Sequence, residues 1–392
     1  MTRRLRIAMV AACPFPSPRG TPIRIRRMAE ALTRRGHDVH VVTYHLDEDD
    51  RSLPFPVHRA ATIGVGGHHA PGPTWTKLLV LDPLLAGTLL GVLRRQPFDL
   101  IHAHHYEGLL AGLFARVLTR IPVVYDAHTM LVSELHHYDL GLTRRAKQRI
   151  ARMLERGLPR RADHVVTVND EIETQLVHHF AVPVDGVTTV LSGVELEHFE
   201  QSLPRVSAPA GRTIIFAGNL AAYQGIDLLL DAFTRLRARR ADVRLVLVGE
   251  SATDPCVLLA ERPELRDHVD LVVGDFAELP RHLAAADVAV SPRTECDGTP
   301  LKLLNYMAAG KAIVSFAGSA KGIADGETGL IVRNGDVGAF ADALDRLLGN
   351  PQLAARLGAA AHEYARRELS WDHAAQSLEG VYERVLGAGR KG

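Results

Sequence analysis

Residues 6–44 read RIAMVAACPFPSPRGTPIRIRRMAEALTRRGHDVHVVTY, and they set out a pattern that the rest of the chain repeats. The short apolar run at 6–12 is typical of a parallel strand that is buried on both faces. A loop rich in proline and glycine follows. Four apolar residues then recur at the i, i+3, i+4, i+7 spacing of an amphipathic helix: Ile25, Met28, Ala29 and Leu32. The run at 37–44 predicts the next strand, so the stretch predicts a strand–helix–strand unit.

The same alternation continues to the end of the chain. Further strands are predicted near 99–105, 121–128, 162–169, 186–192, 213–219, 243–249, 269–275, 286–292 and 312–318. Helices are predicted near 78–93, 107–119, 225–239, 255–266, 300–309 and 371–386. Alternating strands and helices predict an α/β protein with two open, doubly wound and mostly parallel sheets. In such sheets ligands bind beyond the carboxyl ends of the strands.

A linker of Pro/Ser composition at 200–212 divides the series in two. We therefore predict an N-terminal domain at 1–199, a C-terminal domain at 213–370, and a last helix in 371–392 that packs back on the N-terminal domain.

Composition excludes several classes of protein. The 392 residues are 46% hydrophobic and 23% charged, which is ordinary for a globular chain and rules out collagen-like, disordered and disulfide-scaffold proteins. The formal net charge of +1 argues against a nucleic-acid-binding protein. Three widely spaced cysteines favour a reducing compartment, so we expect a cytoplasmic location, and they offer no cysteine-rich metal site. The apolar segment 78–93 is short for a membrane span and is interrupted by Asp82 and Pro83, which favours a buried helix.

Several motifs, taken in order, resemble the retaining glycosyltransferases of family 4. They include GTPIRIRRMAEALTRRGHDVHVVT at 20–43, PVVYDAHTM at 122–130, VLSGVELEHF at 190–199 and the long stretch from 285 to 332. Each motif alone is weak, but their joint order and spacing are specific and cover nearly the whole chain.

The resemblance implies the GT-B fold, with two Rossmann-like domains facing across a cleft. It implies transfer of a hexose-type sugar from a nucleotide-diphosphate sugar to an acceptor hydroxyl, with retention at the anomeric carbon, no metal and no cofactor. The partners expected are the nucleotide sugar and a carbohydrate, lipid-linked or small-molecule acceptor, in the synthesis of envelope polysaccharide, glycolipid or glycosides.

In the N-terminal half, Gly20 and Thr21 end the first loop and open a helix, where an anion is favoured. The resemblance implies that this loop reaches toward the phosphates of the donor. It also implies that His128, in YDAHT, orients the sugar or the acceptor. Adjacent histidines at 102–105 with Glu107 leave a metal site as an alternative, but the sequence supplies no third and fourth ligand, which favours a polar wall.

In the C-terminal half the chain departs from the family pattern of two glutamates separated by seven residues. The register of NYMAAGKAIV places Asp297 and Asn305 at those positions. Asn305 can bind ribose hydroxyls without charge. We predict catalytic roles for His128 and Asp297.

A second departure concerns the residues that neutralise the diphosphate. The family places Arg and Lys in the loop after the first strand of this half, where this chain has Asn219 and Gln224, followed by Gly225. Lys302, one turn before Asn305, is predicted to replace the missing charge together with Arg293. The remaining predicted donor contacts lie in the loop before that helix: Gly298, Thr299 and Leu301.

Two alternatives remain open. The missing charges also fit a catalytically inactive nucleotide-sugar-binding scaffold of the same fold. A nucleotide-sugar epimerase would share the two-domain fold, and turnover of donor without acceptor would favour it.

The net charge is unevenly distributed. Residues 1–205 carry +4 and the remainder carries −3. Many basic residues lie in RRAKQRIARMLERGLPRR at 144–161, where an apolar stripe can be drawn. A basic amphipathic helix can lie on an anionic membrane surface, so peripheral association with the inner face of a membrane is a hypothesis, set against a helix that packs on its own sheet.

Overall fold

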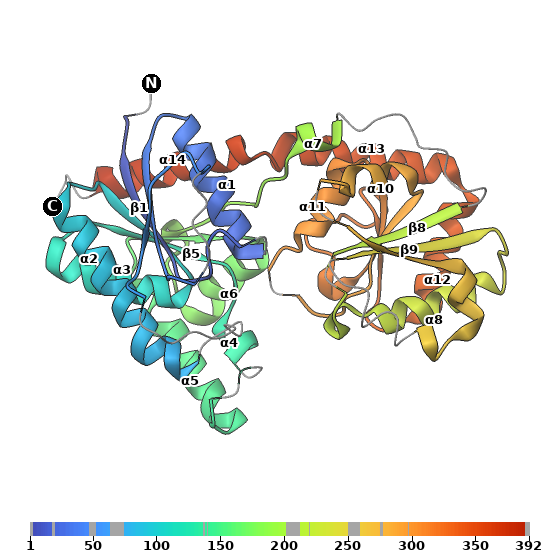
Figure 1. The fold of residues 1–392 in the computed structure, drawn as a ribbon, viewed down its shortest axis with the longest axis horizontal. Helices are drawn as coiled ribbons and strands as arrows, with labels where there is room; N and C mark the ends of the chain where they lie inside the picture. The colour runs from blue at the N-terminus through green and yellow to red at the C-terminus, as the bar shows by residue number, and fades with distance from the viewer. Residues whose placement is uncertain are drawn as a thin grey trace. The chain divides into compact units, whose positions relative to one another are not determined.

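The computed structural model describes residues 3–17, 20–46, 52–62, 74–135, 138, 140–200, 212–218, 220–249, 259–274, 277–296 and 298–388. The chain divides into two compact units (Figure 1). Unit 1 comprises Met1–Gly193 with Trp371–Gly392, and unit 2 comprises Val194–Ser370. Each unit contains one parallel sheet, which confirms the predicted α/β class with two doubly wound domains. The predicted linker falls almost wholly outside the described residues.

The sheet of unit 1 has seven strands in the order β3-β2-β1-β4-β5-β6-β7, and every neighbouring pair is parallel. The strands are β1 Arg6–Ala11, β2 Asp38–Thr43, β3 Val57–Arg59, β4 Leu100–His104, β5 Val123–Ala127, β6 His164–Thr167 and β7 Val187–Thr189. The strand order reverses between β1 and β4, which makes the carboxyl ends of these strands the expected ligand site. The register there pairs Ala11 with His104 and His104 with Asp126.

Helices cover both faces of this sheet. On one face α1 (Gly20–Arg34) and α14 (Trp371–Ala388) pack against each other and bury one apolar core. The second core forms on the other face. Helical segments of the rest of unit 1 are η1 Lys77–Leu81, α2 Asp82–Arg95, α3 His105–Thr119, α4 Leu131–Glu134, α5 Arg144–Gly157, η3 Pro159–Arg161, α6 Asp170–Phe180 and η4 Val184–Gly186.

The C-terminal helix is held to unit 1 by buried charge. Glu379 on α14 accepts hydrogen bonds from Nε and Nη2 of Arg35, each at 2.8 Å, and lies 2.9 Å from His37 Nε2. A side chain at Gly193 would collide with α14, because its Cβ would stand 2.5 Å from Trp371 N. Chain segments far apart in sequence therefore complete one unit.

Unit 2 has a six-stranded parallel sheet in the order β10-β9-β8-β11-β12-β13. Its strands are β8 Arg212–Ala217, β9 Val243–Gly249, β10 Val269–Val273, β11 Val288–Ser291, β12 Ala312–Phe316 and β13 Leu330–Val332. Its helical segments are α7 Leu196–Glu200, η5 Ala222–Gln224, α8 Ile226–Arg237, η6 Pro263–His268, α10 Leu279–Ala285, α11 Leu301–Ala308, η7 Ala317–Ser319, α12 Val337–Gly349 and α13 Pro351–Glu368. The order reverses between β8 and β11, so a second ligand site is expected at their carboxyl ends.

Several elements differ from the sequence prediction. The short edge strands β3 and β13 were not predicted, and the helices α12 and α13 were not singled out although both have apolar stripes. The helix predicted near 255–266 lies partly outside the described residues, and the described part contains the 3-10 segment η6 instead. The apolar segment 78–93 lies within η1 and α2, and no helix in the described ranges is long and apolar enough to cross a membrane.

Helix α5 uses its apolar stripe internally. Ile150 packs beside Leu135 and Leu140, Leu154 packs on the core of the sheet, and Leu158 is buried. Of the apolar side chains in this helix only Met153 is largely exposed, at 64%. The arginines of the helix remain on the outside.

Candidate active site

The predicted functional residues that the structure describes form two clusters, one in each unit, and both lie at carboxyl ends of strands. In unit 1 His128 follows β5, while Gly20 and Thr21 open α1 after the loop that leaves β1. In unit 2 Gln224 follows β8, Arg293 follows β11, and Lys302 lies on α11. These are the edges that the reversal of strand order singles out in each sheet.

A buried ion pair forms the centre of the unit 1 cluster. Asp126, the last residue but one of β5, is fully buried, and Arg24 on α1 is 2% exposed. The guanidinium Nη2 of Arg24 lies 3.3 Å from Asp126 Oδ2 and also donates to Val190 O at 2.8 Å. Burial alone would raise the pKa of Asp126, but the positive charge of Arg24 holds it well below its usual range. Asp126 is therefore an ionised carboxylate within the protein.

Three histidines surround this carboxylate. His102 Nε2 and His104 Nδ1 lie 3.6 Å and 3.5 Å from Asp126 Oδ2, and His128 Nε2 lies 3.7 Å from Oδ1. His104 Nδ1 is 3.1 Å from His128 Nε2. On the far side, the hydroxyl of Tyr382 on α14 is 2.8 Å from His102 Nδ1.

His104, His105 and His128 are neutral near pH 7. Burial lowers the pKa values of His104 and His128 well below the usual value, and it lowers the pKa of His105 to about 4. A proton on His104 Nδ1 would lie between the Asp126 carboxylate and His128 Nε2, so the carboxylate favours that tautomer. His128 then accepts at Nε2 and carries its own proton on Nδ1. The network thus selects which ring atom of His128 is a donor.

The metal alternative gains a third ligand in the structure. His102, His104 and Asp126 offer ligand atoms that lie within 4.8 Å of one another, and Asp126 was not among the ligands considered from the sequence. However, the carboxylate already shares its charge with the guanidinium of Arg24. A divalent cation bound there would lie next to a buried positive charge, which Coulomb repulsion disfavours. The arrangement fits a hydrogen-bonded cluster better than a metal centre.

Gly20 and Thr21 begin α1, the helix that carries Arg24. Gly20 is exposed and Thr21 half-buried at the start of α1. A Cβ at Gly20 would meet nothing within 4 Å, so packing within the protein does not require glycine at this position. The open space and the helix N-terminus suit an anionic ligand.

The unit 2 cluster is built around Lys302. Its ammonium Nζ donates to Gln224 Oε1 and lies 4.1 Å above the ring of Phe216, the strand residue before Ala217. A Cβ at Gly218 would lie 3.6 Å from this Nζ. Burial, with a smaller contribution from the positive charge of Arg293, lowers the pKa of Lys302 to about 7. The Nζ of Lys302 therefore lies against Gln224, one of the two uncharged residues whose missing charge it is predicted to replace.

Arg293 supplies a second cation near this position. It is half-buried, and its guanidinium carbon lies 5.0 Å from the ring centroid of the exposed Tyr223. Within the part of the chain that the structure describes, Arg293 has no carboxylate partner. Tyr223 was not predicted, because an aromatic residue in a loop carries no signal until its neighbours are known.

Two further features position these cations. The hydroxyl of Tyr306, one helical turn after Lys302, accepts from Ala217 N at 2.8 Å and lies 3.2 Å from Ala217 O. This ties α11 to the end of β8. Gly225 has a φ of +73°, and a Cβ there would stand 2.3 Å from Pro292 O, so the β8 and β11 loops meet at a point that only glycine allows. Tyr306 was not predicted, because its position in the apolar stripe of α11 resembles that of a core residue.

The remaining predicted donor residues lie around the start of α11. Gly298, Thr299, Leu301 and Asn305 are all half-buried. Pro300 precedes the helix and has no N–H, so the first free amides belong to Leu301 and Lys302. Asn219 and Asp297 lie outside the described residues.

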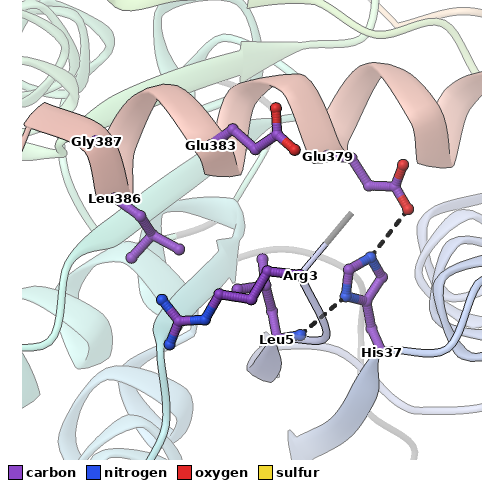
Figure 2. Close-up of a pocket in the computed structure, with 7 residues that line it drawn as sticks. All are labelled: Arg3, Leu5, His37, Glu379, Glu383, Leu386 and Gly387. Carbon is purple, nitrogen blue, oxygen red and sulfur yellow. Dashed lines mark hydrogen bonds and ion pairs between the residues drawn. The ribbon is translucent and has the colours of Figure 1, made fainter. Parts of the chain in front are cut away.

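A separate cavity of about 180 Å³ lies at the opposite edge of the unit 1 sheet, near the start of β1 (Figure 2). It is lined by Arg3, Leu5, His37, Glu379, Glu383, Leu386 and Gly387. His37 bridges two of its walls, since Nδ1 accepts from Leu5 N at 3.1 Å and Nε2 lies 2.9 Å from Glu379. Ligand pockets usually measure roughly 300–1,000 Å³. The cavity is therefore better explained as packing between β1 and α14.

Comparison with known proteins now identifies the family. Residues 19–193 match the model described as "Glycosyl transferase 4-like domain", and residues 211–350 match "Glycosyl transferases group 1". The chain belongs to the group 1 glycosyltransferases of the family 4 type. It is a glycosyltransferase whose two matched regions correspond to the two halves of the alternating pattern.

The individual proteins compared are similar to this chain over nearly its whole length, but at low sequence identity. The D-inositol 3-phosphate glycosyltransferase of Saccharomonospora viridis is 29% identical, with 99% of this chain and 95% of the relative covered. Among solved structures, sucrose-phosphate synthase from Thermosynechococcus elongatus has a TM-score of 0.81 at 22% identity, covering 98% and 100% of the two chains. HepE of Anabaena, solved with UDP-glucose, has a TM-score of 0.72 at 16% identity, covering 97% and 100%. These structures share the GT-B fold with this glycosyltransferase.

Proposed function

We propose that this glycosyltransferase moves a hexose-type sugar from a nucleotide-diphosphate sugar to an acceptor hydroxyl, with retention at the anomeric carbon and without a metal ion. The observation that carries the proposal is the Lys302 ammonium beside Gln224 Oε1, at the end of β8. A diphosphate leaving group must be neutralised as the glycosidic bond breaks. Lys302 supplies a cation where the family's own charged residue is absent.

On the donor side, unit 2 provides the neutralising groups. Lys302 and Arg293 contribute positive charge, and the free amides at the start of α11 contribute partial positive charge. A diphosphate near Lys302 would raise the depressed pKa of its ammonium, so binding and protonation support each other. These groups perform the task that a divalent cation performs in metal-dependent transferases, which is why we propose metal independence.

On the acceptor side, unit 1 provides a pre-organised histidine. With His128 accepting from His104 at Nε2, its Nδ1–H is left to donate to a sugar or acceptor oxygen. In the proposed reaction the acceptor hydroxyl attacks from the face that the leaving phosphate departs. The C–O bond to the phosphate breaks, the new glycosidic bond forms, and a phosphate oxygen takes the hydroxyl proton.

We place the reaction in the cytoplasm, with envelope polysaccharide, glycolipid or glycoside synthesis as its setting. In the described part of the chain, Cys13 and Cys296 are not joined in a disulfide, in keeping with a reducing compartment. The nucleotide carried by the HepE structure makes UDP-glucose the first donor to test. The name of the Saccharomonospora relative puts inositol phosphate in the acceptor panel beside sugars and lipid-linked sugars.

The test begins with a thermal-shift screen of UDP-, GDP- and ADP-sugars, because a ligand that binds only the folded state raises its apparent stability. The donor selected there is then offered with the acceptor panel in the presence and absence of EDTA, and the anomeric configuration of the product is read by NMR. Retained configuration and undiminished turnover in EDTA are expected. Inversion, or loss of turnover that a divalent cation restores, would contradict the mechanism.

One observation favours a second function. Gln224 and Asn305 carry no charge at positions where the family has charged residues. A nucleotide-sugar-binding protein without transfer activity would tolerate these changes. Saturable donor binding by calorimetry, combined with no transfer to any acceptor and no donor hydrolysis, would establish that alternative.

A further inference from the structure

An apolar surface of unit 1 takes no part in the proposed chemistry. It is formed by Leu78 and Leu79 of η1 and by one stripe of α3: Leu110, Phe114, Val117 and Leu118. Their exposures run from 36% for Leu78 to 80% for Val117. Helices α2 and α3 pack side by side on the same face of the sheet, so η1 and α3 belong to one surface, here called the α2–α3 face.

The sequence of α3 explains why this face is unusual. The stripe at 110, 114, 117 and 118 has helical spacing i, i+4, i+7, i+8 and points outward. A second stripe, which includes Leu109, Gly112 and Ala115, is buried against the sheet. A helix on the surface of a globular protein normally places polar residues opposite its buried stripe. A helix that is apolar on both sides indicates that something covers its outer face.

The charged side chains around this face are mainly positive. Arg94 and Arg95 end α2, and Arg116 and Arg120 lie in and just after the last turn of α3. Arg116 is paired with the exposed carboxylate of Asp163, at 2.9 Å. The carboxylates of η1, α2 and α3 are Asp82, which binds Tyr44, and Glu107, and neither is exposed.

Nearby, α5 and η3 extend the positive charge. They hold seven exposed arginines with no carboxylate partner in the described ranges: Arg144, Arg145, Arg149, Arg152, Arg156, Arg160 and Arg161. Helix α3 lies in the connection from β4 to β5, and α5 and η3 lie in the connection from β5 to β6. Both connections run in the same direction along the sheet. Connections of one handedness place their helices on the same face. The α2–α3 face and the α5 arginines therefore lie on the same side of unit 1.

We propose that the α2–α3 face docks on an anionic lipid surface, with the arginines of α2, α3 and α5 at the headgroups. A second copy of the chain related by a two-fold axis would bring two faces rimmed mainly by arginine together, and the adjoining carboxylate of Asp163 is already paired with Arg116. An anionic bilayer offers both an apolar layer and negative charge. The interaction goes beyond sugar transfer, and its test needs no donor or acceptor.

The test is co-sedimentation of the full chain with vesicles of phosphatidylcholine, alone or with about 30 mol % phosphatidylglycerol. We expect the wild-type chain to pellet with the anionic vesicles and to be released progressively as salt is raised, because exposed charges are screened. The double variant Phe114→Ser, Val117→Ser is expected to bind at least tenfold more weakly. The matched control is Val184→Ser, a 69% exposed apolar residue on another segment of unit 1, which is expected to bind like the wild type.

A second variant separates charge from apolar contact. Arg152→Gln, Arg156→Gln is expected to weaken binding to anionic vesicles severalfold without changing the weak binding to neutral ones. Because all the substituted side chains are exposed, the melting temperatures should match that of the wild type, which checks folding.

Three results would overturn the proposal. The first is a wild-type chain that stays in the supernatant with anionic vesicles. The second is equal vesicle binding by the wild type and the Phe114, Val117 double variant. The third is a wild-type dimer in light scattering that this double variant converts to a monomer, which would assign the face to a second copy. Donor binding measured without vesicles reports on the proposed function separately.

Discussion

The two candidate clusters differ in how their charges are satisfied. In unit 1 the Asp126 carboxylate is fully buried and is paired with Arg24 and surrounded by histidines before any ligand arrives. In unit 2 the partners of Lys302 among the described residues are a neutral amide and an aromatic ring, and its pKa is depressed to about 7. A group whose charge is already matched stabilises the fold and holds its neighbours in place. A buried cation without a counter-ion destabilises the fold and favours an incoming anion.

The largest effect is expected from Asp126→Asn. The change leaves the Arg24 guanidinium buried without its carboxylate, and breaking a buried pair in this way costs about 3–5 kcal/mol. The unfolding midpoint of unit 1 in urea should fall accordingly. The control is Asp242→Asn, which breaks an exposed pair with Arg212 in unit 2 and should cost about 0–1 kcal/mol. Equal midpoints for the two variants would show that the unit 1 cluster does not support the fold.

Unlike Asp126→Asn, Lys302→Met is expected to leave the fold at least as stable as the wild type, and it should weaken donor binding. It removes a cation that would bind the donor diphosphate, so donor affinity should fall roughly 10- to 100-fold, as expected for a hydrogen bond to a charged group. Stability should stay equal or rise, because an unfavourably buried charge is lost. Calorimetry with the selected donor and urea unfolding measure the two effects. The matched control is Lys321→Met, a half-buried lysine in another loop of unit 2. A loss of stability without loss of affinity would make Lys302 a structural residue.

The pH dependence of donor binding sharpens the comparison further. Lys302 has a pKa of about 7 in the folded protein against 10.5 for an ordinary lysine side chain, so the folded state loses this proton first. Donor affinity should therefore fall as pH rises through about 7, by at most tenfold per pH unit. The same shift makes the contribution of Lys302 to stability most unfavourable below pH 7, and this penalty is relieved as pH rises from about 7 toward 10.5. In Lys302→Arg the side chain stays charged, so a pH profile of donor affinity as steep as that of the wild type would refute this assignment.

The smallest effects are expected from a matched pair of buried tyrosines, one in each unit. Tyr382→Phe removes the hydroxyl bound to His102, and Tyr306→Phe removes the hydroxyl bound to Ala217. Each should cost on the order of 1 kcal/mol of unfolding free energy. Only Tyr306→Phe should also weaken donor binding, since Tyr306 holds α11 and thereby Lys302. A weaker donor affinity in Tyr382→Phe as well would mean that the two clusters are not independent.

Much of the fold could be predicted from local patterns. Apolar runs such as 6–12 and the stripe from Ile25 to Leu32 specify their elements because each buries one face, and the order of the elements specifies parallel sheets. The edge strands β3 and β13 were missed because three residues carry too little pattern. Helices α12 and α13 were not singled out, although both have apolar stripes, because no site motif drew attention to them.

The order of motifs was enough to indicate the family, and that resemblance, together with position relative to the strands, nominated His128, Gln224 and Lys302. Tertiary structure alone decided the partners: Arg24 with Asp126, Lys302 with Gln224, Tyr382 with His102. These pairs join residues 78 to 280 positions apart, and no local pattern encodes such distances. The tertiary structure also decided that the apolar stripe of α5 faces inward and that one apolar stripe of α3 stays exposed. Residue spacing predicts a stripe, but its burial depends on what packs against the helix.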